Sequence, residues 1–156
     1  MTIIAIDPGN EKSAVVAYSD GAIVTAFIQP NEEVRKYLYE LPNFSYVIAC
    51  EGIQSFGMAV GKTVFETAYF IGQLKEIARR CGFGYNLVTR MQVKMHLCHT
   101  TRAKDTNIRQ ALIDRYGGKE LAIGNKKNPG VLYHIKADMW SAVAIAITYS
   151  ETIKNG

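Results

Sequence analysis

The chain has 156 residues, of which 48% are hydrophobic and 21% are charged. This length and composition predict a single globular domain over residues 1–156 and exclude a disordered chain. No apolar run approaches the length of a membrane span and the first residues lack the layout of a signal peptide, so no membrane association is expected. The three cysteines are scattered without paired spacing, which is typical of free thiols in a reducing cytoplasm.

The net charge of +4 is distributed unevenly. Residues 1–89 carry 7 Lys/Arg against 9 Asp/Glu, whereas residues 90–156 carry 11 against 5. A basic C-terminal half suggests an anionic partner such as nucleic acid, although a solvated basic surface explains the charge equally well. The individual candidates for phosphate contacts in this half are Arg102, Lys104, Arg109, Lys126 and Lys127.

The first half of the chain reads as strands followed by a helix and another strand. Residues 2–7 (TIIAID) have the composition of a buried strand that ends at the Pro8-Gly9 turn. Residues 13–29 predict a hairpin turning at Asp20-Gly21. Residues 31–42 predict a helix capped by Asn31, and residues 46–53 (YVIACEGI) predict a second core strand.

Helices dominate the second half. A long helix is expected at residues 64–82, with an apolar stripe that belongs either to the core or to a dimer interface. A short strand follows at residues 85–90, then a helix at 105–117 capped by Asp105 and a polar, basic loop at 118–130. The last segment, residues 132–150, predicts a helix rich in small apolar residues. This order predicts an α/β fold of three layers, with a mixed five-stranded sheet flanked by helices.

Each of the two core strands ends on an acidic residue, Asp7 or Glu51. If the second strand returns parallel to the first, both carboxylates project side by side at the sheet edge where open α/β folds place their sites. A carboxylate there is costly unless it is paired or holds a cation. The simpler alternative is that Asp7 only starts its turn by bonding the backbone of residues 9 and 10.

Asp138, in the last predicted helix, is a third candidate acid. It could simply complement the helix dipole. On a continuous helix, however, His134 and Ser141 would share its face. Three acids from two strands and a packed helix would form an oxygen-rich site suited to two Mg²⁺ ions, or to Mn²⁺, about 3.5–4 Å apart. Together with the basic half, such a site predicts phosphodiester hydrolysis.

Three blocks of the sequence resemble those of a known family. IIAIDPGN, IACEGIQ and ADMWSAVAIAIT are similar, in order and spacing, to the acidic blocks of RuvC-type Holliday junction resolvases of the ribonuclease H-like superfamily, and TRAKDTNIRQAL resembles that family's basic segment. The resemblance implies a metal-dependent endonuclease acting on four-way or other branched DNA as a homodimer, with Asp7, Glu51 and Asp138 as metal ligands. That family usually adds a fourth acid three residues after the third acid, where this chain has Ser141, or a histidine three residues before it, whereas His134 precedes Asp138 by four. His134 is either a ligand or proton shuttle or a plain cap-region histidine.

Several other signals remain open or are set aside. Gly57 and Gly61 are separated by one residue too few for a phosphate-binding loop, but Lys62 after them remains a candidate DNA contact. Phe56 could stack on an unpaired base or could belong to a satellite core, and Trp140 is expected in the core. The competing functions are an RNA-processing relative of the same superfamily and a catalytically silent nucleic-acid-binding module.

Overall fold

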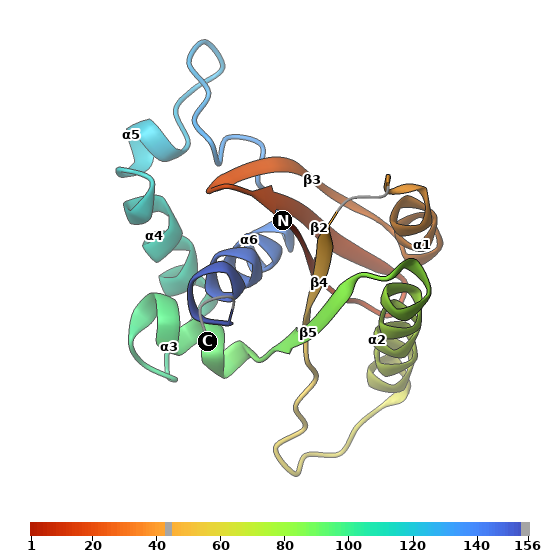
Figure 1. Cartoon of the computed structure of the whole chain (residues 1–156). Helices are drawn as coiled ribbons and strands as arrows, with labels where there is room; N and C mark the ends of the chain where they lie inside the picture. The colour runs from red at the N-terminus through yellow and green to blue at the C-terminus, as the bar shows by residue number, and fades with distance from the viewer. Residues whose placement is uncertain (43–44, 154–156) are drawn as a thin grey trace.

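A computed structural model describes residues 1–42 and 45–153 of the chain, so the ends of the predicted domain at 154–156 lie outside the described residues. Five strands form one sheet in the order β3-β2-β1-β4-β5 (Figure 1). The strands are β1 (Thr2–Asp7), β2 (Lys12–Ser19), β3 (Ala22–Pro30), β4 (Tyr46–Glu51) and β5 (Gly84–Val88). β1 pairs antiparallel with β2 and parallel with β4, which is itself parallel to β5. The predicted mixed five-stranded sheet is confirmed.

Helices cover both faces of the sheet. Alternate residues of β1 enter two separate hydrophobic clusters, because successive side chains of a strand point to opposite faces. Ile4 and Ile6 pack with α1 (Asn31–Glu40) and α2 (Lys62–Cys81), while Ile3 and Ala5 pack mainly with α6 (Met139–Thr148). Two further helices, α3 (Arg90–Cys98) and α4 (Asp105–Arg115), lie on the α6 side (Figure 1). The three-layer prediction is therefore confirmed.

The hairpin between β2 and β3 turns as its sequence predicts. Asp20 and Gly21 both have positive φ, 50° and 84°, as a two-residue turn between twisted strands requires. Asn31, by contrast, does not cap α1. Its Oδ1 accepts from the Ser13 hydroxyl (2.7 Å) and its Nδ2 donates to the Gly9 carbonyl (2.9 Å). Asn31 thus ties the loop that follows Asp7 to the start of α1.

The last helix is shorter than predicted. It begins at Met139 and is followed by a π-helical turn at Tyr149–Ile153, while residues 131–138 form turns. Ala137 has a φ of 46°, and a left-handed residue breaks any helix that runs through it. Leu132 and Ile135 are nevertheless buried, so these turns pack on the core. Their apolar spacing imitated a helix, which explains the error.

Three smaller differences concern helix starts and short helices. The segment after β5 forms α3, which the sequence analysis did not predict, and the basic loop contains the four-residue α5 (Lys119–Ala122). Lys104 occupies the N-cap of α4, so Asp105 is its first helical residue and not its cap. Within residues 1–42 and 45–153, no helix is both long and apolar enough to span a membrane.

Candidate active site

The two strand-end acids lie together. β1 and β4 are parallel neighbours paired as far as Ile6 and Cys50, and Asp7 and Glu51 are the next residue on each strand. Their carboxyls interact through a hydrogen bond, for which one of them must keep a proton. The alternative that Asp7 only serves its turn does not account for this contact. The residues predicted to meet at this edge of the sheet do so.

Asp138 approaches the same edge of the sheet from the helical layer that contains α6. It occupies the N-cap of α6, with its carbonyl accepting from the N–H of Ala142 (3.2 Å), and its carboxylate is within electrostatic reach of Asp7. One helical turn further on, the Ser141 hydroxyl hydrogen-bonds to Asp7. The face shared by Asp138 and Ser141 therefore looks onto Asp7.

His134 is not part of this arrangement. Because residues 131–138 form turns, His134 does not share a helical face with Asp138, which corrects the expectation stated above. Its exposed ring stacks edge-on against Tyr133, with centroids 4.8 Å apart. Its role as a ligand or proton shuttle stays a prediction without a contact to the acids.

The environment holds Asp7 in its neutral form. Burial, the charge of Glu51 and its hydrogen bond, and then the charge of Asp138 raise the pKa of Asp7 from 3.8 to about 8, and the Ser141 hydrogen bond opposes the rise. Buried carboxylates that repel one another are typical of sites that take up a cation, although structural clusters show the same shift. The donor set consists of hard oxygen atoms, which suits Mg²⁺ or Mn²⁺.

The acids are not arranged as a finished metal cage. Among the residues that the structure describes, no three His, Cys, Asp or Glu side chains are placed to hold one metal ion together. Glu51 instead forms an ion pair with a basic side chain of the protein, because Arg90 Nη1 lies 3.4 Å from its Oε1. The metal site therefore remains a prediction about these three acids.

Arg90 is the residue that sequence reasoning missed. It is the first residue of α3 and forms ion pairs with both Glu51 and Asp105, so it joins β4 to the start of α4. A signal for it was present in the sequence. Thr89 and Gln92 form a capping box, whose S/T-x-x-E/Q spacing predicts a helix starting at Arg90.

A cavity of about 420 Å³ opens beside the acids. Glu51, Arg90 and Asp138 line it together with residues of α4 and α6. Arg109 also lines it and lies over the ring of Trp140, 4.6 Å from the centroid, a cation–π contact. Trp140 is thus partly exposed at the cavity, not enclosed in the core as predicted.

The loop between β4 and α2 forms a second hollow of about 250 Å³ on the other side of Glu51 and Arg90. Phe56 lines it, is 70% exposed and has a φ of 48°. It does not belong to a satellite core. Lys62, at the start of α2, is also exposed and pairs with Glu66 at 3.5 Å. A DNA contact by either residue stays a prediction.

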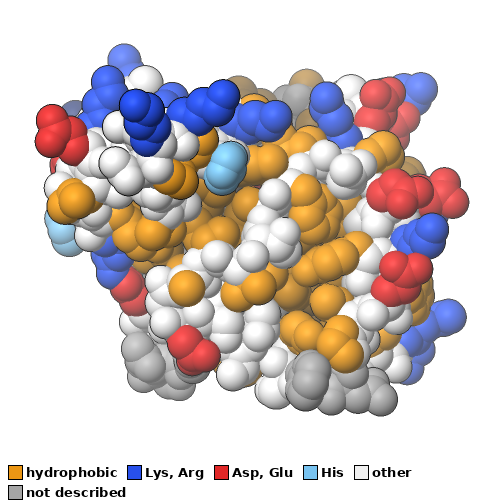
Figure 2. All heavy atoms as spheres, turned by 90° about the horizontal axis from the view of Figure 1, so that it is seen from above, with side chains coloured by type: hydrophobic (Ala, Val, Ile, Leu, Met, Phe, Trp, Pro, Cys, Tyr) orange, Lys and Arg blue, Asp and Glu red, His pale blue; other side chains and the backbone are white. Residues whose placement is uncertain are grey.

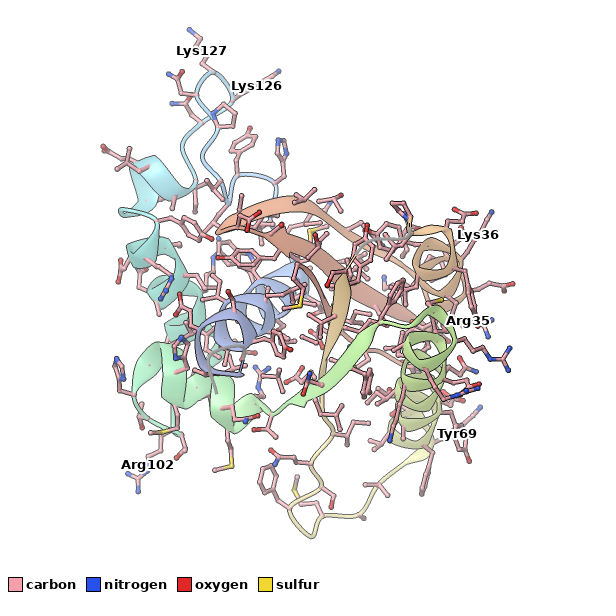
Figure 3. All side chains as sticks on the ribbon, viewed as in Figure 1. Arg35, Lys36, Tyr69, Arg102, Lys126 and Lys127 are labelled. Carbon is pink, nitrogen blue, oxygen red and sulfur yellow. The ribbon has the colours of Figure 1, made fainter. Side chains whose placement is uncertain are left out.

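The remaining basic candidates lie away from the acids. Arg102 and Lys104 are exposed on the connection between α3 and α4, and Arg102 points away from the body at the lower left of Figure 3. Lys126 and Lys127 lie at the tip of the loop at the top of Figure 3. Within residues 1–42 and 45–153, neither pair forms an ion pair with Asp7, Glu51 or Asp138.

The fold has close counterparts among solved structures, although no protein-family model and no curated protein sequence matches the chain. The structure of Thermus thermophilus RuvC superposes with a TM-score of 0.72 over 100% of this chain and 97% of that one, at 16% identity. T. thermophilus RuvC in complex with a Holliday junction substrate gives a TM-score of 0.70 at 15% identity, covering 100% and 96%. The chain has the RuvC fold. The resemblance that three short blocks suggested thus extends to the whole architecture, which is ribonuclease H-like.

Proposed function

We propose that this chain is a metal-dependent endodeoxyribonuclease that resolves four-way (Holliday) or other branched DNA junctions by paired phosphodiester hydrolysis, in DNA recombination or repair. The observation that carries the proposal is the convergence of Asp7, Glu51 and Asp138 at one edge of a RuvC fold. A RuvC of the same fold has been solved with a Holliday junction substrate, which supports branched DNA as the ligand. The basic C-terminal half is consistent with a polyanionic partner.

Asp7, Glu51 and Asp138 would hold Mg²⁺, with Mn²⁺ as a substitute and two ions in the site. When bound, such ions activate a water and stabilise the leaving oxygen of a phosphodiester. Burial and then the charge of Glu51 raise the pKa of Asp7, and a bound cation would favour its charged form and release the proton. Ser141 holds the Asp7 carboxylate by a hydrogen bond, and Arg90 holds Glu51 from the α3 side.

Substrate contacts would surround this centre. The guanidinium of Arg109, which lies over the ring of Trp140, lines the cavity beside the acids and is suited to a phosphate. Phe56 on its exposed loop is suited to stack on a base at the open centre of a junction. Arg102, Lys104 and Lys62 would contact phosphates of the arms.

A four-way junction has two-fold symmetry, so a homodimer would present one site to each of two like strands. The proposal therefore includes a C2 dimer acting in the cytoplasm. Sedimentation of the protein with and without a junction tests this part separately from catalysis.

The deciding experiment incubates the protein and Mg²⁺ with a synthetic four-way junction, a linear duplex of the same sequence and an RNA–DNA hybrid. We expect paired nicks in the junction, little cutting of the others, and no cutting by Asp7→Asn. Asp20→Asn, the same change in an exposed turn, is the matched control and should cut normally. Preferential cutting of the hybrid would favour the RNA-processing alternative, and binding without any cutting would favour the silent module.

A further inference from the structure

A loop between α5 and the turns before α6 stands out from the body of the molecule. It comprises residues 124–130, here named the basic finger, and projects at the top of Figure 1. Lys126 and Lys127 lie at its tip and point outward (Figure 3). None of the three acids, and none of the residues that line the cavity beside them, belongs to it.

The finger has a defined internal structure. Gly124 and Pro129 form an antiparallel bridge, and the N–H of Asn125 donates to the carbonyl of Asn128 (3.1 Å). The side-chain Oδ1 of Asn125 accepts from the N–H groups of Lys127 (2.9 Å) and Asn128 (3.0 Å). These hydrogen bonds within the turn fix the conformation of the tip, in which both lysines are exposed.

The base of the finger is fixed to the core. The N–H of Gly130 donates to Ile123 and that of Leu132 to Ala122, both at 2.8 Å, and Ala122 and Leu132 are completely buried or nearly so. Gly130 has no room for a side chain, because a Cβ there would lie 2.2 Å from the carbonyl oxygen of Ala122. A projection anchored in this way cannot swing freely without disturbing buried residues.

The charge of the finger is entirely positive. Lys126 and Lys127 are its only charged residues, both are exposed, and neither forms an ion pair with any residue that the structure describes. Seen from the side toward which the finger points, Lys and Arg side chains gather at the upper left and most acidic ones lie at the right (Figure 2). A rigid, unneutralised pair of lysines favours a partner with closely spaced negative charges.

We propose that the basic finger binds the phosphate backbone of a duplex arm, away from the acids. This rests on the proposed function, because it takes duplex DNA as the ligand. Ile135 to Asp138, a few residues after the finger, line the cavity beside the acids, so the finger starts close to the site. Asp138 lies eleven positions after Lys127, and a chain spans at most about 3.6 Å per residue, which limits their separation to about 40 Å. At about 3.4 Å per base pair the finger contacts an arm within about 12 base pairs of the site.

The test compares two double variants in binding assays at several salt concentrations. Lys126→Ala/Lys127→Ala removes the finger's charge, and Arg35→Ala/Lys36→Ala removes the same charge from α1, on the other side of the molecule in Figure 3. Each is measured on a junction with arms of about 20 base pairs, which extend beyond that limit. Asn125→Ala, which keeps the charges and opens the turn, is a third variant.

We expect the finger variant to bind the long-armed junction about ten- to a hundredfold more weakly near 0.1 M salt, with a log–log salt slope smaller by up to about 1.8, or 0.9 per phosphate contact. The α1 control should bind like the unaltered protein, and Asn125→Ala should fall in between. Wild-type affinity of the finger variant on long arms, or an equal loss in the α1 control, would overturn the inference.

Failure of the proposed function would look different. If the unaltered protein binds junctions and duplexes with the expected finger dependence but never cuts them, the finger is upheld and the nuclease is refuted. If the unaltered protein cuts junctions normally and the finger variant binds them normally, the nuclease is upheld and the finger is refuted. Circular dichroism of each variant separates lost contacts from lost structure.

Discussion

Asp7→Asn should stabilise the metal-free protein at neutral pH, because the substitution removes a carboxylate that the fold disfavours. The pKa of Asp7 is about 8 in the folded chain, against 3.8 as its ordinary value, so the folded state binds the proton more tightly than the unfolded state. Stability must then fall as pH rises between these two values. At about 1.4 kcal/mol per pKa unit, the cost of folding with Asp7 is near zero below pH 3.8, about 4 kcal/mol at pH 7 and about 6 kcal/mol above pH 8.

The assay is urea unfolding in EDTA from pH 4 to pH 9, for the unaltered protein, Asp7→Asn and the exposed control Asp20→Asn. We expect Asp7→Asn to be more stable by up to about 4 kcal/mol at pH 7, with the difference vanishing near pH 4. Asp20→Asn should follow the unaltered protein throughout. Mg²⁺ should stabilise the unaltered protein at pH 8 more than Asp7→Asn, since binding to the folded state adds to its stability. A difference between the two that does not change with pH would refute the reasoning, whatever the nuclease assay shows.

Three further predictions concern the substrate and the site. Phe56→Ala should lose junction cleavage in a nicking assay while its salt slope of binding stays unchanged, since stacking releases no counterions. Ser141→Ala should lower the rate of single-turnover cleavage more than His134→Ala, because Ser141 contacts Asp7 and His134 does not. The opposite order would return His134 to the candidate ligands or proton shuttles. Arg102→Ala/Lys104→Ala should weaken binding to junction and linear duplex alike, as competition titrations would show, because phosphates carry no information about branching.

The sheet and two of its acids could be predicted because each depends on local sequence. Ile3 to Ile6 form a continuous apolar run, as a strand buried on both faces must, and the following Pro8 and Gly9 mark where it ends. The parallel return of β4 follows from the intervening α1. Given those two strands, Asp7 and Glu51 had to meet at one edge, and the structure brings them into contact.

The surroundings of the acids could not be predicted, because they depend on contacts between distant segments. Arg90 pairs with Glu51, 39 residues away, and with Asp105, 15 residues away, and nothing in the local sequence of α3 specifies either partner. The apolar periodicity before α6 led to the wrong prediction of a helix for a related reason. Leu132 and Ile135 are spaced as on a helix, but they are buried by turns whose left-handed residue, Ala137, carries no sequence signal of its own.

The ion pairs of Arg90 and the turns before α6 both affect how the three acids are placed. The turn at Ala137 ends the segment that carries the basic finger and sets Asp138 at the start of α6, while Arg90 holds Glu51 against α3. Asp7 and Glu51 are held at the ends of adjacent strands of the sheet, whereas the position of Asp138 depends on the turns before α6. A cation bound by these acids must compete with Arg90 for the Glu51 carboxylate. Arg90→Gln should then bind Mg²⁺ more tightly in calorimetric titration, and weaker binding would instead assign Arg90 to holding Glu51 in place for the ion.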